Sequence, residues 1–286
     1  MKFNQIYIEI TKDCNLKCPF CPSAFVRNQH MSLSDIEKVI QNTDKYTDTY
    51  YLHVLGETLL YPDVNQLLSI FDQYYKKAKI TTNGLLLSRY TNVLLSHPSV
   101  KQVNISVQSW IQFTKRQQLS LTDDLIKFIK KNDQKITVVV RFWNDKNNDM
   151  VKELNKNVYD ELIKNLNLVE DEESFSYNGG QNKIRLKPYL FISSDDEFIW
   201  PSLNLEVNNN ANYCLGGKKQ LAILNNGDVV LCCLDYTGKT KTGNIFENDL
   251  TTILNSEPYL DFIRLIKNHK SYFELCQKCD YRNRFN

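Results

Sequence analysis

Two groups of cysteines, far apart in the sequence, constrain this chain more than any other feature. The first group is Cys14, Cys18 and Cys21, and the second comprises Cys214, Cys232, Cys233, Cys276 and Cys279. Cysteines at such short spacings serve either as disulfide partners or as metal ligands. The compartment decides between the two, because thiols stay reduced in the cytoplasm.

The sequence favours the cytoplasm. Residues 1–10 alternate polar and apolar side chains and lack the continuous apolar core of a signal peptide. No apolar run is long enough to span a bilayer, so we expect no membrane association. In a cytoplasmic protein the two cysteine groups are therefore interpreted as metal ligands.

The charge balance argues against a dedicated nucleic-acid binder. Thirty-five basic residues face thirty-three acidic ones, which gives a net charge of +2. No basic block stands out, so the electrostatic footprint of a DNA- or RNA-binding surface is missing.

Strand-like and helix-like segments alternate through the first two thirds of the chain, which predicts an α/β fold with a parallel sheet and helices packed outside it. The sheet can be open or closed into a barrel. We expect strands near 5–10, 50–55, 78–82, 101–107, 135–142 and 184–190. We expect helices near 33–43, 63–76, 85–96, 120–131 and 150–165. The polar stretch 170–182, with the acidic run Glu170-Asp171-Glu172-Glu173, is interpreted as a solvated loop.

The pattern changes after about residue 213. Two apolar segments flank Asn226-Gly227, a dipeptide that predicts a two-residue β-hairpin. A helical segment near 249–268 and the pair Cys276-x-x-Cys279 follow. We therefore predict two domains, residues 1–205 and residues 206–286, the second a small cysteine-rich unit of hairpin and helix.

The first cysteine group has the spacing C-x3-C-x2-C directly after the first predicted strand. Three thiolates can hold three irons of a cubane cluster and leave the fourth iron open for chemistry. A zinc site would need a fourth ligand, and the nearby histidine is His30, in a polar segment typical of the surface.

This motif, with the aromatic Phe20 before its third cysteine, resembles the signature of the radical S-adenosylmethionine superfamily. The resemblance implies a partial (β/α)6 TIM-type barrel and a [4Fe–4S] cluster bound to S-adenosylmethionine (SAM). It also implies reductive cleavage of SAM to a 5′-deoxyadenosyl radical that abstracts hydrogen from a substrate.

The strand ends carry further residues of this resemblance. Gly56-Glu57-Thr58 resembles the family's Gly-Glu-Pro motif, whose carboxylate binds the amino group of SAM; Thr58 stands where proline is usual. The other predicted cofactor contacts are Phe20, Asn83, Ser106, Gln108 and Arg141, the last as a fork for the SAM carboxylate. Ordinary strand-end capping or surface exposure is the alternative for Asn83, Ser106, Gln108 and Arg141. His53 shares the parity of Glu57 and is expected to face the barrel interior, more as a packed histidine than as a catalytic one.

The second cysteine group contains the arrangement C-x12-G-x4-C, from Cys214 through Gly227 to Cys232. This resembles the opening of the SPASM domain, which binds auxiliary clusters in many radical SAM enzymes. Since the full pattern has more cysteines, the chain resembles the shortened, single-cluster twitch version. We predict a second [4Fe–4S] cluster on Cys214, Cys232, Cys276 and Cys279. Cys233 is the surplus thiol, because neighbouring strand residues point to opposite faces; a four-cysteine zinc ribbon is the alternative.

Together these features predict an oxidoreductase-type radical SAM enzyme, similar to an uncharacterised group of stand-alone radical SAM/SPASM proteins. It would oxidise or modify a small molecule or peptide, with a flavodoxin or ferredoxin as electron donor. The first strand begins within ten residues of the start, so we expect no leader-binding domain, which favours a small molecule or a substrate delivered by a partner. The alternatives are a peptide (RiPP) maturase with a separate leader-binding partner, and a zinc- or cluster-stabilised binding module without turnover.

Overall fold

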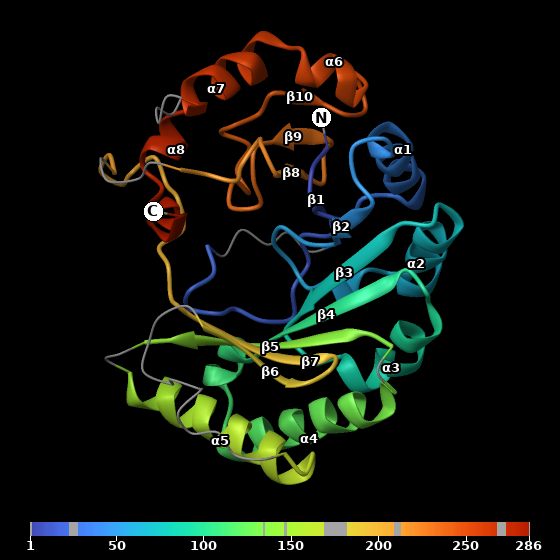
Figure 1. Ribbon diagram of the computed structural model, residues 1–286, viewed down its shortest axis with the longest axis vertical. Helices are drawn as coiled ribbons and strands as arrows, with labels where there is room; N and C mark the ends of the chain where they lie inside the picture. The colour runs from blue at the N-terminus through green and yellow to red at the C-terminus, as the bar shows by residue number, and fades with distance from the viewer. Residues whose placement is uncertain are drawn as a thin grey trace. The chain divides into compact units, whose positions relative to one another are not determined.

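The computed structural model describes residues 2–22, 28–133, 135–145, 148–168, 182–208, 213–267 and 273–285 (Figure 1). The chain forms two compact units. Unit 1 comprises residues 1–15, 22–77 and 198–286, and unit 2 comprises residues 16–21 and 78–197. The acidic run at 170–173 lies outside the described residues.

Unit 1 contains five strands in the order β10-β9-β8-β1-β2. These are β1 (Gln5–Ile8), β2 (Thr49–Tyr51), β8 (Gln220–Ile223), β9 (Asp228–Val230) and β10 (Gly243–Asn244). β1 runs parallel to both β2 and β8, whereas β9 and β10 are antiparallel additions. Its helices are α1 (Leu33–Thr43), α2 (Val64–Gln73), α6 (Leu250–Leu254), α7 (Glu257–Lys267) and α8 (Glu274–Gln277), with the 3-10 turns η1 (Thr58–Leu60) and η3 (Asp280–Phe285).

Unit 2 contains the strands in the order β3-β4-β5-β7-β6. They are β3 (Lys77–Thr82), β4 (Val100–Ser106), β5 (Thr137–Asn144), β6 (Asn182–Lys187) and β7 (Leu190–Asp196). β3, β4, β5 and β7 are parallel, and β6 pairs antiparallel with β7. Its helices are α3 (Leu87–Ser96), α4 (Lys115–Lys131) and α5 (Asp149–Asn165), with the 3-10 turn η2 (Val107–Gln112).

Each parallel strand of unit 2 buries one face against the helices. Ile80, Val103, Ile105, Val138 and Val140 are fully buried. In β3 and β4 these residues alternate with polar neighbours, whereas β5 also buries Val139 between Val138 and Val140. Figure 1 shows α3, α4 and α5 on one side of these strands. The period of two places every second side chain under the helices. The helices thus pack on the face of the sheet, and the carboxyl ends of the strands can carry binding residues.

The alternation of strands and helices is confirmed, with boundaries within a few residues for most elements. α4 begins earlier than predicted because Thr114 and Gln117 form a capping box at its start. The helical segment predicted near 249–268 is two helices, α6 and α7, which are separated at Asn255 and Ser256.

The sixth predicted strand, 184–190, is wrong. That range spans the reversal between β6 and β7, where Lys187 pairs with Leu190 across a two-residue turn. Pro188 lies in the turn and has no backbone N–H for a sheet ladder. The sixth parallel element therefore begins at Leu190, and β6 is an additional antiparallel edge strand.

The predicted two-residue hairpin at Asn226-Gly227 is also wrong in its length. The N–H of Gly227 donates to the carbonyl of Leu224 at 2.8 Å, and the N–H of Leu224 donates to the carbonyl of Asp228 at 2.9 Å. Gly227 has a φ of +85°. These contacts define a three-residue loop that ends in a left-handed glycine.

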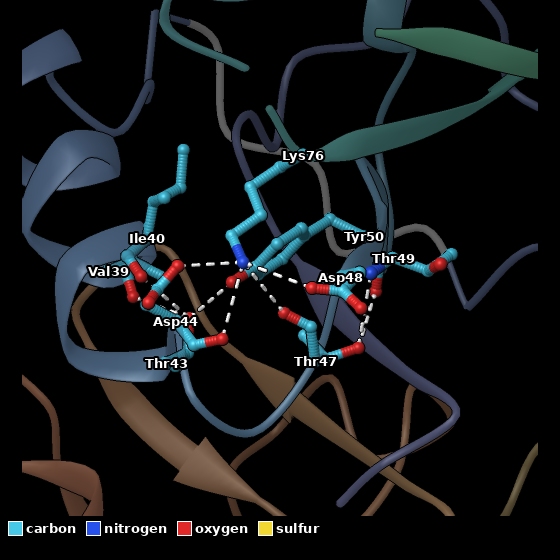
Figure 2. A network of polar contacts seen from close by, with 9 residues as sticks. All are labelled: Val39, Ile40, Thr43, Asp44, Thr47, Asp48, Thr49, Tyr50 and Lys76. Carbon is cyan, nitrogen blue, oxygen red and sulfur yellow. Dashed lines mark hydrogen bonds and ion pairs between the residues drawn. The ribbon is translucent and has the colours of Figure 1, made fainter. Parts of the chain in front are cut away.

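A buried lysine joins the two loops that connect α1 to β2 and α2 to β3 (Figure 2). Lys76 is 6% exposed, and its Nζ forms ion pairs with Asp44 at 2.7 Å and Asp48 at 3.2 Å. It also donates to the carbonyls of Asp44 and Thr47 at 3.2 and 3.3 Å. Since Asp44 is the C-cap of α1, the ammonium group satisfies carbonyls that a helix end leaves unpaired.

Replacing Lys76 by Met should therefore lower the free energy of unfolding by about 2 kcal/mol, because two buried carbonyl oxygens lose their donor. Urea unfolding measures the change. Lys77→Met is the matched control, since Lys77 is exposed and its backbone N–H keeps its bond to Asp48. Equal stability of the two variants would contradict this role for Lys76.

No helix among the described residues is long and apolar enough to cross a membrane.

Candidate cofactor and metal sites

The segment that leads from β1 to the first cysteine is held by the residues just before Met31. Thr11 forms a bridge with His30, and its Oγ1 lies 2.8 Å from Nδ1 of that ring. Lys12 donates its backbone N–H to the carbonyl of Gln29 at 3.0 Å. His30 also packs edge-on against Tyr61. The histidine weighed as a zinc ligand thus has a structural contact through Nδ1.

The first cysteine group is divided between the two units. Cys14 belongs to unit 1, and Cys18 and Cys21 belong to unit 2. The N–H of Cys21 donates to the carbonyl of Cys18 at 3.0 Å, and Nε2 of Gln112 donates to Sγ of Cys18 at 3.4 Å. Burial raises the pKa of the Cys18 thiol to about 11. A donor directed at the sulfur suits a thiolate ligand of an iron–sulfur cluster.

Gly56 and Glu57 lie against the segment that precedes Cys14. Gly56 has a φ of +80°, and a Cβ there would lie 2.5 Å from the carbonyl oxygen of Thr11 and 3.0 Å from that of Asp13. The N–H of Glu57 donates to the Asp13 carbonyl at 2.8 Å. Its carboxylate is 1% exposed and accepts the N–H of Leu59 at 3.0 Å, which caps η1.

Three of the predicted cofactor residues lie at the carboxyl ends of neighbouring strands in unit 2. Ser106 on β4 pairs with Arg141 on β5, and Asn83 follows Thr82, which pairs with Ile105. Asn83 is held in place, since its Oδ1 accepts the N–H of Leu85 and its carbonyl accepts Nε1 of Trp110. Gln108 is 8% exposed in η2, and its Oε1 has no hydrogen-bond partner among the described residues.

A pocket of about 430 Å³ adjoins the cysteine motif within unit 2. The ring of Phe20 packs against Trp143 with a centroid separation of 4.6 Å. Further lining residues are Pro19, Gln108, Ile111, Gln112, Asp145, Asn148, Met150, Val151 and Glu197. Burial, and then the nearby charge of Asp145, raises the pKa of the Glu197 carboxyl.

Sequence reasoning missed Trp143, Asp145, Asn148 and Glu197. Their positions could have indicated them. Trp143 lies at the end of β5, Asp145 and Asn148 follow it, and Glu197 follows β7. Barrel enzymes place catalytic and binding residues at these carboxyl ends. Glu197 was out of reach because the strand before it was placed too early.

His53 lies in an aromatic group of unit 1. Its ring packs edge-on against Tyr7 and Tyr51, which stack on each other at 4.8 Å. These contacts agree with the packing role that the sequence favoured over a catalytic one.

Four cysteines of the second group interact with one another in unit 1. Burial raises the pKa values of Cys214, Cys232, Cys276 and Cys279, that of Cys279 to about 11. The charges of the other three thiolates also raise the pKa of Cys232, and Cys214 does the same for Cys276 and Cys279. The N–H of Gly216 donates to Sγ of Cys214 at 3.3 Å.

The predicted strand position of Cys232 and Cys233 is wrong, because β9 ends at Val230 and both residues follow it in a turn. Cys233 nevertheless has a different environment from its neighbour. It shares a hydrogen bond with Tyr7 of β1. It also packs, with Tyr7 and Tyr236, against the buried cluster of Val54, Ala222, Leu224 and Val230. Among the charges that raise the pKa of Cys232, that of Cys233 is the largest. The pKa of Cys276 is raised by Cys214 and Cys279, and that of Cys279 by Cys214.

The donor sets fit iron–sulfur clusters by their chemistry. Each group supplies thiols with a hydrogen-bond donor directed at one sulfur, and the second group supplies four thiols that act on one another. Across the described ranges, no three His, Cys, Asp or Glu side chains are arranged to hold a single metal ion. The fit to iron–sulfur clusters therefore rests on the presence of the thiols and not on a preformed metal geometry.

The chain belongs to the radical SAM superfamily, whose family model matches residues 8–154. A second model, the SPASM iron–sulfur cluster-binding domain, matches residues 214–280. The chain is thus an enzyme of the radical SAM type, with a [4Fe–4S] cluster and SAM as cofactors and an auxiliary iron–sulfur domain. The predicted boundary at residue 205 stays a prediction.

Individual relatives are distant. A probable GTP 3′,8-cyclase from Methanococcus maripaludis is 30% identical over 106 residues, 36% of this chain and 35% of that protein. The chain thus spans about a third of the length of this curated relative.

Solved structures are similar over nearly the whole chain. SuiB of Streptococcus suis bound to the precursor peptide SuiA has a TM-score of 0.63 and 18% identity, over 99% of this chain and 73% of that one. BtrN in complex with AdoMet and 2-DOIA has a TM-score of 0.55 and 16% identity, over 98% and 94%. These structures confirm the predicted fold class, a partial TIM-type barrel with a C-terminal extension.

The surroundings of Cys232 and Cys233 generate a test of the ligand set. Cys232→Ser should lower the iron content of the reconstituted protein by about four atoms per chain, because a ligand of the second cluster is lost. Cys233→Ser should leave the content near about eight. Iron analysis after anaerobic reconstitution measures both variants. If Cys233 proves essential and Cys232 dispensable, the proposed ligand is wrong; if both variants keep all their iron, neither holds a cluster.

A buried carboxylate near the Gly56 loop generates a second test. Burial is the largest cause that raises the pKa of Glu9 from its ordinary 4.5 to about 6. An acid whose pKa is higher in the folded chain stabilises the fold below pH 4.5, and this stabilisation is lost as the pH rises through 6. Between pH 5 and 7.5, wild type should lose about 1 kcal/mol of unfolding free energy relative to Glu9→Gln. Parallel urea-unfolding profiles would contradict the shift.

Proposed function

We propose that this enzyme reductively cleaves SAM at the first cysteine motif and uses the resulting radical to oxidise or modify a small molecule or a peptide. One observation carries the proposal. The buried carboxylate of Glu57 lies on a loop that is bonded to Asp13, the residue directly before Cys14. An acceptor for an ammonium group thus stands beside the first proposed cluster ligand.

The chain's own residues would bind and orient the cofactor. Glu57 accepts from the amino group of SAM, and Arg141 faces its carboxylate with a bidentate fork. Asn83 and Ser106 supply polar contacts for the ribose. The pocket formed by Phe20 and Trp143 suits the flat adenine ring, and Oε1 of Gln108 provides an acceptor at its edge. Cys14, Cys18 and Cys21 hold the cluster and leave one iron open. When bound, the cluster and SAM supply a 5′-deoxyadenosyl radical.

The second cysteine group would hold an auxiliary cluster that does not chelate the substrate. Burial raises the pKa values of Cys214, Cys232, Cys276 and Cys279 alike, which supports these four as ligands of one fully coordinated cluster. The packing of Cys233 with Tyr7 and Tyr236 against an apolar cluster supports a place outside it. Full coordination favours electron transfer or structural support over substrate binding. We further propose a flavodoxin or ferredoxin as electron donor, a cytoplasmic location and no role in nucleic-acid binding.

The substrate class stays open between a small molecule and a peptide. A relative of the chain is a probable GTP 3′,8-cyclase, and a structurally similar protein is bound to a precursor peptide. The peptide maturase remains the second candidate because the fold is shared with SuiB.

The central test measures SAM cleavage without substrate. Reduced, reconstituted enzyme should slowly release methionine and 5′-deoxyadenosine, which chromatography detects. Replacing Cys14, Cys18 and Cys21 by Ala should abolish the release, because the open iron is lost. Glu57→Ala should mainly weaken SAM binding, by about ten- to a hundredfold for a lost charge-assisted contact of about 1.5–3 kcal/mol.

Cys233→Ser serves as the matched control, since it removes a thiol outside both proposed ligand sets. Cleavage that persists in the triple Cys variant would overturn the proposed function. A colourless, zinc-loaded protein after anaerobic purification would instead support a binding module without turnover.

A further inference from the structure

Glu9 follows directly after β1 and is fully buried, with 0% exposure. Its backbone is bonded to the β8–β9 hairpin. The N–H of Glu9 donates to the carbonyl of Ile223 at 2.8 Å, and Nδ2 of Asn225 donates to the carbonyl of Glu9 at 3.4 Å. A charged side chain at this depth requires compensating contacts, because burial of a carboxylate is costly.

The contacts of the carboxylate come from two separate loops. The N–H of Asn225, in the hairpin turn, donates to Oε2 at 3.1 Å, and Nζ of Lys12 lies 3.7 Å from the same oxygen. Oε1 has no partner within hydrogen-bonding distance among the described residues. The carboxylate and the backbone of Glu9 therefore attach the end of β1 to the hairpin turn.

Leu55 directly precedes Gly56 and Glu57. The following residues are already fixed on one side, since Gly56 packs against the carbonyls of Thr11 and Asp13 and the N–H of Glu57 donates to Asp13. Glu9 lies at the start of the segment that carries these two carbonyls. Among the described residues, the groups directed at its carboxylate are donors: one backbone N–H group and one ammonium. The side chain at position 9 must therefore be a hydrogen-bond acceptor. A glutamine amide there would direct its own N–H at one of these donor groups.

We propose that Glu9 is a positioning residue of the cofactor site, which fixes to the turn between β8 and β9 the segment against which Gly56 and Glu57 pack. The inference rests on the proposed function, because that function assigns the ammonium group of SAM to Glu57. Glu9 then makes SAM affinity depend on the C-terminal hairpin, the same hairpin that leads to Cys232.

The test uses the reconstituted holoenzyme with SAM as the probe. Glu9→Gln should raise the Kd for SAM about tenfold, the equivalent of one weakened charge-assisted contact. The rate of SAM cleavage at saturating SAM should change less than twofold, and iron content should match wild type. The unfolding free energy should differ from wild type only by the pH-dependent change of about 1 kcal/mol that loss of the Glu9 titration brings. Hydrogen–deuterium exchange should become faster in peptides that cover 52–59 and 223–228. If Glu9 had only a structural role, the rate of SAM cleavage and the stability of the protein would fall together with the affinity for SAM.

Glu37→Gln is the matched control, since Glu37 lies on α1 and bonds to the hydroxyl of Tyr74; its Kd should equal that of wild type. Glu9→Asp, which keeps the charge with a shorter reach, covers the case in which Glu9→Gln does not fold, and should weaken SAM binding less than Glu9→Gln.

An unchanged Kd in both Glu9 variants, with weaker binding in Glu57→Ala, would overturn this inference and leave the proposed function standing. A change in Kd that occurs only with loss of iron would overturn it as well. If Glu57→Ala itself leaves the Kd unchanged, the assignment of Glu57 fails and the inference fails with it.

Discussion

The close approach of Gly56 to the chain before Cys14 is the contact on which the cofactor site of unit 1 depends. Any side chain at position 56 would collide with the carbonyl oxygens of Thr11 and Asp13, and its backbone has a positive φ that favours glycine. Because no side chain intervenes, the N–H of Glu57 reaches the Asp13 carbonyl. The buried carboxylate and the first cysteine are thereby positioned by a single backbone contact, and the Thr58 departure from the family's proline leaves that contact intact.

The second cysteine group differs from the first, because its thiols come from segments that lie far apart in the sequence. Burial raises the pKa values of four of its five thiols, those of Cys214, Cys232, Cys276 and Cys279. Arg282, which is 3% exposed, lowers the pKa values of Cys214, Cys276 and Cys279. One buried cation offsets part of the negative charge that four thiolates bring. Deprotonation of the rest requires the positive charge of iron, so cluster binding and folding of this region are linked.

The sequence was informative wherever a local pattern dictates geometry, and misleading where a distant contact decides. The period-two strands and the capped helices were predictable, and so were the two cysteine groups. The reversal at Pro188 was not, because β6 and β7 read as one apolar segment until their pairing is known. Glu9 shows the same limit: nothing local distinguishes it from an exposed strand-end carboxylate, and its burial follows from β1 lying between β2 and β8.

The tandem pair Cys232-Cys233 illustrates how strand pairing resolves an ambiguity that spacing leaves open. Tyr7 pairs in register with Ala222, so its ring lies over the inner side of the β8–β9 hairpin. That position gives Cys233 a hydrogen-bond partner and an apolar neighbourhood within reach of β1. Burial and the charges of Cys233, Cys214, Cys276 and Cys279 raise the pKa of Cys232. Cys233 thus attaches this segment to β1, whereas Cys232 is the proposed iron ligand. Because Tyr7 also stacks on Tyr51 of β2, the hairpin that carries Cys232 is held to the same two strands that position Glu9 and the Gly56 loop.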